Sequence, residues 1–175
     1  MSKRALLLYP NQLFAVENLP KDIDQIIVIE EPLLFGRDLQ YPMFMHKQKL
    51  VFMRASMRRY IEEQLWPAGY QVDYIEFHQM NETGDVVNLL HNFDLVEYFE
   101  LNDDVLSRRL STAIAGVEHK PDVNILDSPN FYLTAQEVDS FFANKQKAFF
   151  VNFYQWQRER FNILIDEKTY KPVGG

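Results

Sequence analysis

Residues 5–9 read Ala-Leu-Leu-Leu-Tyr, and residues 10–13 follow them with Pro-Asn-Gln-Leu. Four of the five residues at positions 5–9 are apolar, and they do not alternate with polar residues. Such a run is typical of a strand that is covered on both faces, in the middle of a parallel sheet. Ligands of open α/β sheets bind outside the carboxyl ends of such strands. We therefore expect the turn at 10–13 to carry polar side chains to a ligand crevice.

Further strands are predicted after this first one. Apolar or alternating segments occur at 25–29, 71–77, 95–101 and 123–126, and helical patterns lie between several of them. Strands that alternate with helices indicate a five-stranded parallel, Rossmann-like α/β sheet with helices on both faces. Because crossovers are right-handed and the first strand is central, the expected strand order is 3-2-1-4-5.

The alternation of strands and helices ends after the fifth strand. Residues 134–137 read Thr-Ala-Gln-Glu, a capping box that predicts a helix to about Asn144. A second helix is predicted at about Lys147–Leu164, with aromatic residues on more than one of its faces. We therefore expect an α/β domain at 1–130 and a helical extension at 131–175.

The longest predicted helix is His46–Trp66. Its apolar residues recur at helical spacing, which predicts one buried face. The residues of this face are Leu50, Met53, Met57, Ile61 and Leu65. On the exposed surface we expect two ion pairs at i,i+4 spacing, Arg58 with Glu62 and Arg59 with Glu63.

The composition excludes several classes of site. The chain has no cysteine, so it offers no disulfide, no thiolate zinc site and no ligand for an iron–sulfur cluster. No Gly-rich loop follows the first strand, so neither a P-loop nor a dinucleotide-binding fingerprint is present. The formal net charge is −7, opposite in sign to that of a dedicated DNA-binding domain. No apolar run approaches the length of a membrane span, so we expect no contact with a membrane and a cytoplasmic location.

No catalytic residue and no metal site is predicted. The 4 histidines do not share a helical face with a carboxylate at metal-ligand spacing. Asp103 and Asp104 are adjacent, but successive helix residues do not face each other, so helix capping explains this pair better than acid–base chemistry. The 14 Phe and 9 Tyr indicate thick aromatic packing, a buried flat ligand or a docking face.

Polar residues after the first two strands are the candidate ligand contacts. Asn11 and Gln12 could hydrogen-bond to a heterocycle, or they could simply make the turn. Glu30 and Glu31 follow the second strand, where they are either ligand contacts or solvated loop charges. Lys49 and its neighbours open the long helix, where cations oppose the helix dipole. Cations at an unfavourable position of the helix dipole indicate a specific role, such as an ion pair with one of the two glutamates or the binding of an anion.

Several separate stretches together resemble one protein family. They are residues 11–14 (Asn-Gln-Leu-Phe), 46–50 (His-Lys-Gln-Lys-Leu), 55–58 (Ala-Ser-Met-Arg), 68–74 (Ala-Gly-Tyr-Gln-Val-Asp-Tyr), 153–158 (Phe-Tyr-Gln-Trp-Gln-Arg), 164–166 (Leu-Ile-Asp) and 172–175 (Pro-Val-Gly-Gly). In this order they resemble the amino-terminal part of the photolyase-related proteins, the bacterial iron–sulfur cryptochromes and (6-4) photolyases. The resemblance covers nearly the whole chain, and the stretches at 46–50 and 172–175 are its most specific parts.

The resemblance implies a role within a larger flavoprotein. In that family this region is an α/β antenna domain, followed by a linker and a larger helical domain. The helical domain holds FAD, a cysteine-ligated iron–sulfur cluster and the DNA lesion site. The resemblance therefore implies that residues 131–175 lead toward that linker, that the partner of this chain is the helical FAD domain, and that DNA is contacted only through it. The chain itself would catalyse nothing, whereas the full-length protein would be a photolyase-related lyase.

The antenna chromophore of the family is commonly 6,7-dimethyl-8-ribityllumazine, which lies near the ends of the first strands. The contacts that the resemblance implies here, carried over by position, are Asn11, Gln12, Leu13, Glu30, Lys49 and Met53. The family usually has Gly-Asp-Gln-Leu where this chain has residues 10–13. Light harvesting for flavin-dependent DNA photorepair or photoreception is the leading expectation. Two alternatives stay open: a chromophore-free docking domain of the same flavoprotein, and a free-standing nucleotide-binding α/β protein.

Overall fold

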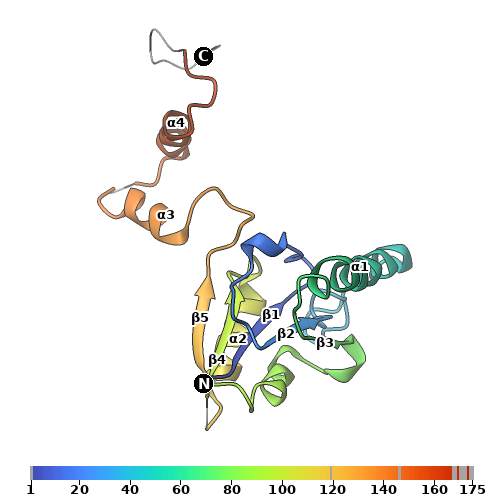
Figure 1. Ribbon diagram of the computed structural model, residues 1–175. Helices are drawn as coiled ribbons and strands as arrows, with labels where there is room; N and C mark the ends of the chain where they lie inside the picture. The colour runs from blue at the N-terminus through green and yellow to red at the C-terminus, as the bar shows by residue number, and fades with distance from the viewer. Residues whose placement is uncertain (1, 119, 146, 167–168, 170–172, 174–175) are drawn as a thin grey trace. The chain divides into compact units, whose positions relative to one another are not determined.

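The computed structural model describes residues 2–118, 120–145, 147–166, 169 and 173. By its internal contacts the chain divides into two compact units, Met1–Asn130 and Phe131–Gly175. The first unit holds a sheet and the second is helical (Figure 1). Most of the Pro-Val-Gly-Gly end, which carried part of the family resemblance, lies outside the described residues.

Five parallel strands form the sheet of the first unit, in the order β3-β2-β1-β4-β5 (Figure 1). The strands are β1 (Arg4–Leu8), β2 (Gln25–Ile29), β3 (Val72–Ile75), β4 (Leu95–Phe99) and β5 (Asp122–Leu126). β1 lies in the middle, where Leu6 is opposite Ile26 of β2 and Glu97 of β4. The predicted fold class and strand order are confirmed.

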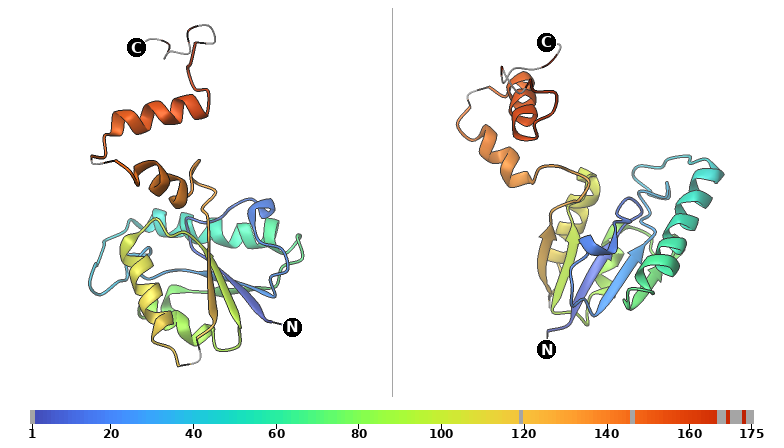
Figure 2. Two further views of the ribbon diagram at one scale, coloured as in Figure 1. Left: turned by 90° about the vertical axis from the view of Figure 1, so that its left-hand side faces the viewer. Right: turned by 45° about the horizontal axis from the view of Figure 1, so that its top comes forward.

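Helices cover both faces of this sheet, which explains the apolar run in β1. Figure 2 shows α1 (Lys47–Tyr60) on one face and α2 (Asp104–Ala115) on the other. Leu6 packs in the core beneath α1, whereas Leu7 packs in the core beneath α2. All of residues 5–9 are 0% exposed. A strand buried on both faces has no solvent side on which polar residues would be favoured, so the usual alternation is absent.

The predicted helix His46–Trp66 is confirmed, but its last turn is π-helical. α1 ends at Tyr60, and Ile61–Leu65 (η2) continues it as a π-helix. His46 caps the start, where its ring Nδ1 accepts a hydrogen bond from the backbone N–H of Gln48 at 3.2 Å. The buried residues of the predicted face are Met57, Ile61 and Leu65, and the half-buried ones are Leu50 and Met53.

One of the two predicted ion pairs on this helix forms. Arg59 Nε lies 2.8 Å from Glu63 Oε2. Arg58 instead pairs with Glu76, whose Oε1 lies 2.8 Å from Arg58 Nη2, and not with the glutamate four residues along the helix. The Arg58 guanidinium also lies 3.9 Å from the centre of the Tyr74 ring. The end of β3 therefore supplies both a carboxylate and an aromatic face, which together outcompete a solvated i,i+4 pair.

The boundaries of α2 agree with its sequence signals. The side chain of Asp103 accepts from the backbone N–H of Leu106 at 2.9 Å, so this residue is an N-cap and not half of a catalytic pair. Gly116 forms the C-cap. Three short 3-10 segments complete the first unit: η1 (Val16–Asn18), η3 (Phe77–Gln79) and η4 (Thr83–Leu89).

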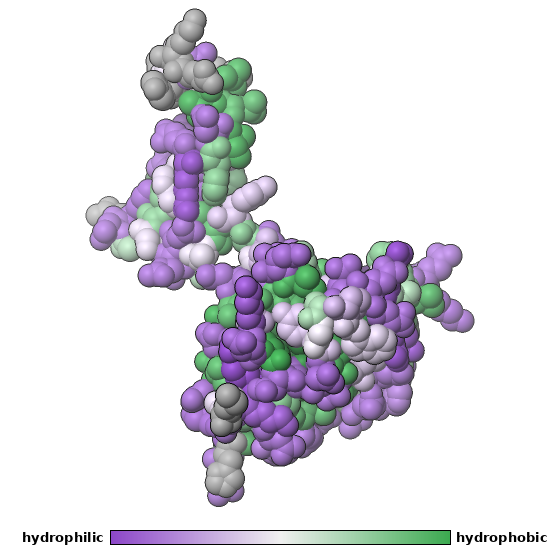
Figure 3. Space-filling model, viewed as in Figure 1, coloured by the Kyte–Doolittle hydropathy of each residue, from purple (hydrophilic) through white to green (hydrophobic). Residues whose placement is uncertain are grey.

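Among its described residues, the second unit has the helices α3 (Ala135–Phe142) and α4 (Phe150–Arg160), both shorter than predicted. The predicted capping box at 134–137 is present. The Phe141 ring stacks on the indole of Trp156, with ring centres 4.6 Å apart. None of the residues in these two described helices is buried, and Figure 3 shows green, apolar surface over this unit. The exposed aromatic residues of α4 and its N-cap, Phe149, Phe150 and Tyr154, therefore remain available to a partner.

Candidate functional site

Gln12 lies where the crossovers of the sheet change direction, between the carboxyl ends of β1 and β4. It is 2% exposed. Its Nε2 donates to the carbonyl oxygens of Phe99, at 3.1 Å, and of Glu100, at 3.4 Å. Its Oε1 accepts from the backbone N–H of Tyr9 at 3.4 Å. Ligands of open α/β sheets bind at this switch point, but here the amide side chain joins the two strand ends to each other.

Glu30 is fully buried at the carboxyl end of β2. Its two carboxylate oxygens accept from Arg54, with Nε at 2.6 Å and Nη2 at 2.5 Å, and from the phenol of Tyr74. The backbone N–H of Phe77 donates to the same carboxylate at 3.1 Å. Burial raises the pKa of Glu30, but these hydrogen bonds outweigh it and hold the pKa below its ordinary value. Glu30 thus ties α1 to the ends of β2 and β3 as a charged, fully paired group.

Glu31 follows Glu30 directly but meets the opposite face of the sheet. It is 1% exposed, and its Oε1 accepts from the hydroxyl of Thr83 in η4 at 2.7 Å. Its Oε2 has no hydrogen-bond partner among the residues that the structure describes. Burial, which the hydrogen bonds from Thr83 and Leu33 only partly offset, raises the pKa of the Glu31 carboxyl. Successive residues of an extended chain point to opposite faces, so the side chains of Glu30 and Glu31 lie in two different environments.

Tyr9 lies on the same side of the sheet as Glu31. It is 0% exposed, and its phenol oxygen has no partner within the described part of the chain. Burial, and after it the charge of Glu31, raises the pKa of Tyr9 well above the ordinary value for tyrosine. The phenol therefore stays protonated and keeps a hydrogen to donate.

The raised pKa of Glu31 predicts a pH-dependent stability difference. An acid whose pKa is raised by folding stabilises the protein below its ordinary value of 4.5 and loses that contribution as the pH rises. We expect Glu31→Gln, which cannot ionise, to become more stable relative to the wild type as the pH rises from 4.5 to 7.5. Urea unfolding of both proteins at pH 4.5 and pH 7.5 measures this, and an unchanged difference between the two pH values would contradict the prediction.

A cleft of about 880 Å³ opens on this side of the sheet. Its walls are loop 38–41, the start of η4 and one side of α2. These segments follow the carboxyl ends of β2, β3 and β4, the edge at which α/β proteins bind ligands. The lining residues include Asp38, Tyr41, Glu82, Thr83, Asn88 and Arg109.

Arg109 of α2 holds the loop that forms one wall of the cleft. Its guanidinium pairs with the 3% exposed carboxylate of Asp38 and donates to Gln40 Oε1 at 2.7 Å. It also lies 5.4 Å from the centre of the Tyr41 ring. Hydrogen bonds from Arg109 keep the pKa of Asp38 below its ordinary value, so the pair is charged at neutral pH. The contacts of Arg109 with Asp38, Gln40 and Tyr41 therefore hold one wall of the cleft to α2.

Comparison with known proteins identifies the family. The family model of the deoxyribodipyrimidine photo-lyase-related proteins matches residues 6–175. The chain belongs to this family. It is also similar to an uncharacterized protein of Acanthamoeba polyphaga mimivirus, 31% identical over 187 residues that cover 99% of this chain and 89% of that protein. The resemblance to the photolyase-related proteins that was inferred from the sequence motifs is confirmed.

The six residues predicted to contact a chromophore in this photolyase-related chain do not share one surface. Asn11 and Lys49 are exposed, whereas Gln12 and Glu30 are buried and engaged with other groups of the chain. Leu13 and Met53 are half-buried beside the α1 core. None of the six lines the 880 Å³ cleft, and no ligand contact has been tested for any of them. The cation that pairs with Glu30 is Arg54, not one of the cations at the start of α1.

Sequence reasoning missed the residues that surround the cleft. Tyr9 was interpreted only as the end of a strand, and no ligand contact was predicted at Thr83, Asp38 or Arg109. Asp38 and Arg109 are 71 residues apart, so no local pattern could pair them. The usable signal was Glu31, because alternation along the chain places it on the face opposite Glu30.

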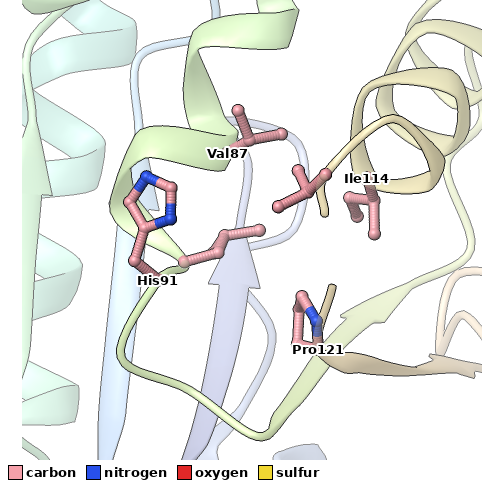
Figure 4. Close-up of a pocket in the computed structure, with 6 residues that line it drawn as sticks. Val87, His91, Ile114 and Pro121 are labelled. Atoms are coloured by element: carbon pink, nitrogen blue, oxygen red, sulfur yellow. The ribbon is translucent and has the colours of Figure 1, made fainter. Parts of the chain in front are cut away.

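A second, smaller crevice lies near the amino ends of β4 and β5. Figure 4 shows Val87, His91, Ile114 and Pro121 around it. It has no room for a water molecule, so it is a packing defect and not a ligand site. Across the described residues, no group of three or more His, Cys, Asp or Glu could hold a metal ion, and no helix is long and apolar enough to cross a membrane.

Proposed function

We propose that this chain is the pigment-binding amino-terminal module of a photolyase-related flavoprotein. In this proposal it holds a flat light-harvesting chromophore, commonly 6,7-dimethyl-8-ribityllumazine in this family. The pigment passes its excitation to FAD and so supports DNA photorepair or photoreception. The observation that carries the proposal is the cleft of about 880 Å³ at the carboxyl edge of the sheet, a volume typical of ligand sites. The class of ligand is taken from the resemblance to the antenna domains of this family, whose model matches the chain.

The rest of the machinery would lie outside this chain. We propose the subfamily of the bacterial iron–sulfur cryptochromes and (6-4) photolyases, with FAD, the iron–sulfur cluster and the DNA lesion site in a helical partner domain. DNA would be contacted through that domain and not through this acidic chain, whose net charge is −7. The cytoplasm is the proposed location, without contact to a membrane.

The second unit is the proposed docking surface for that helical FAD domain. α4 exposes Phe150 by 75% and Tyr154 by 49%, and the two rings stack on each other with centres 6.2 Å apart. Exposed aromatic residues beyond these are Phe131, Tyr132, Phe149 and Phe161. An apolar surface of this kind is unfavourable in water and is typical of an interface.

Reconstitution tests the pigment assignment. The purified chain is mixed with 6,7-dimethyl-8-ribityllumazine, and absorbance spectra and equilibrium dialysis report binding. We expect a red-shifted absorbance band and a dissociation constant in the micromolar range or tighter. Absence of binding at tens of micromolar pigment would remove the lumazine assignment.

One observation favours a chromophore-free docking domain as a second candidate. Gln12 and Glu30, two of the predicted pigment contacts, form hydrogen bonds with other groups of the chain. If their task is only structural, substitutions there change the stability of the full flavoprotein but not its sensitivity to light. An action spectrum of the full protein, recorded with and without the added pigment, separates the two candidates.

A further inference from the structure

Tyr41 is the aromatic residue among the described residues that line the cleft. Its side chain is 51% exposed. The guanidinium of Arg109 lies over the ring, 5.4 Å from its centre. A ring that a cation covers on one side and that lines a cleft with the rest of its surface is suited to stacking on a flat, conjugated group.

The backbone that carries this ring is held in place by Asp38. Oδ1 of Asp38 accepts from the backbone N–H groups of Gln40, at 2.9 Å, and of Tyr41, at 2.8 Å. The same carboxylate is 3% exposed and pairs with Arg109 of α2. Loop 38–41 is thus tied to α2, so a ligand that stacks on Tyr41 does not bear the entropic cost of ordering this loop.

Small residues line the cleft where η4 approaches α2. Gly84 belongs to η4 and Ala113 to α2, and both line the cleft. A Cβ atom added to Gly84 would lie 3.9 Å from the Cβ of Ala113, in ordinary van der Waals contact. Neither residue has a side chain long enough to fill the space beside Tyr41, which leaves that space open to a ligand.

The backbone donors at the start of η4 are already engaged. Phosphate groups in proteins often bind to free backbone N–H groups at the start of a helix. Here Asp85 Oδ2 accepts from the N–H groups of Asn81, at 2.7 Å, and of Glu82, at 3.4 Å. The N–H of Asp85 donates to the carbonyl oxygen of Glu82 at 3.1 Å. A carboxylate therefore stands where a phosphate would find its donors.

The charges of the cleft also disfavour an anion. Its lining residues include three acids, Asp38, Glu82 and Asp85, and two cations, Arg108 and Arg109. Both arginines have carboxylate partners, since Arg109 pairs with Asp38 and Arg108 with Asp104. The other two acids of the cleft form no ion pair with any residue that the structure describes. The field that remains in the cleft is negative and repels a phosphate.

We propose that the cleft binds a flat, uncharged heterocycle stacked on the ring of Tyr41 and rejects the phosphorylated form of the same compound. This inference rests on the proposed pigment function, and it specifies the residue on which the pigment stacks and the charge that the pigment must lack. The hydroxyl groups of a ribityl chain match the uncharged polar residues of the cleft, Asn81, Asn88 and Thr112. A nucleotide would bring its phosphates to Glu82 and Asp85 instead.

Tyr41→Leu tests the stacking. Leucine is apolar but has no aromatic face, so the dissociation constant for ribityllumazine should rise about 10-fold, whereas Tyr41→Phe should bind as the wild type does. Phe44→Ala is the matched control, because Phe44 is a fully exposed aromatic residue of the same inter-element segment and does not line the cleft. Equilibrium dialysis measures the affinities, and urea unfolding checks that each variant is folded.

The 5′-phosphate ester of ribityllumazine tests the rejection of phosphate. We expect the wild type to bind this ester at least about 10-fold more weakly than the free pigment. Glu82→Gln removes one negative charge from the cleft and should reduce that difference. Glu62→Gln removes the same charge from the π-helical turn after α1, which does not line the cleft, and should leave the difference unchanged.

The outcomes distinguish the inference from the function on which it rests. Suppose that the wild type binds ribityllumazine, but that Tyr41→Leu binds it equally well, or that the phosphate ester binds as tightly as the free pigment. The inference is then overturned and the pigment function stands. If the wild type binds neither compound, both are overturned. Weaker binding by Tyr41→Leu and of the ester, with Phe44→Ala and Glu62→Gln unaffected, supports the inference.

Discussion

Glu30→Ala is expected to lower the free energy of unfolding by about 3 kcal/mol at neutral pH. The substitution leaves the Arg54 guanidinium, the Tyr74 phenol and the backbone N–H of Phe77 without their common acceptor. The estimate lies at the lower end of the range for a broken buried ion pair, because the side chain of Arg54 is 39% exposed and keeps part of its hydration. Urea unfolding followed by circular dichroism measures the change.

Glu63→Ala is the matched control on the same helix. Glu63 pairs with Arg59 at 2.8 Å, but both side chains are more than half exposed, so the loss of stability should be much smaller than that of Glu30→Ala. Equal losses for the two variants would contradict the role assigned to Glu30.

The stabilisation by Glu30 should also disappear in acid. Its hydrogen bonds hold the pKa below the ordinary 4.5, so its contribution is present above that value and is lost as the pH falls through the lower value of the folded protein. The gap between the wild type and Glu30→Ala should therefore narrow when the unfolding experiments are repeated at decreasing pH below 4.5. A gap that stays constant would mean that the carboxylate charge is not what stabilises this network.

Leu7→Ala is expected to lower the free energy of unfolding by about 3–5 kcal/mol. Leu7 is 0% exposed in the central strand, between Ile27 of β2 and Tyr98 of β4. Truncation removes apolar contacts and leaves a cavity that strands held on both sides cannot close. Urea or thermal unfolding measures the loss.

Leu39→Ala provides the comparison for an exposed leucine. Leu39 is 89% exposed in the loop at the cleft, so the same change of side chain should cost less than about 0.5 kcal/mol. A similar loss at both positions would show that β1 is not the buried centre of the fold.

The elements of the first unit were predictable because their signals are local. The apolar runs at 5–9 and 25–29, the helical spacing in α1 and the caps of α2 each act within a few residues. The π-helical end of α1 was not predictable, because nothing in its apolar spacing distinguishes that turn from an α-helical one. The ion pair of Arg58 with Glu76 was also not predictable from the helical spacing, since Glu76 follows β3 and lies outside the helix.

The candidate site was predictable only to the level of the sheet edge. Polar residues at the carboxyl ends of β1 and β2 were expected there, and Gln12, Glu30 and Glu31 lie there. Each of these residues has hydrogen-bond partners in distant parts of the chain. Arg54 pairs with Glu30, whereas the hydroxyl of Thr83 donates to Oε1 of Glu31.

The sequence by itself determined the parallel sheet, its order and the family, because uninterrupted apolar strands and ordered motifs are properties of neighbouring residues. Only the tertiary structure decided that Glu30 is a structural anchor and that Tyr9 and Glu31 are buried on the other side of the sheet. The reason is physical: hydrogen-bond satisfaction and burial are settled by contacts between segments far apart in the chain, and no local pattern encodes those contacts.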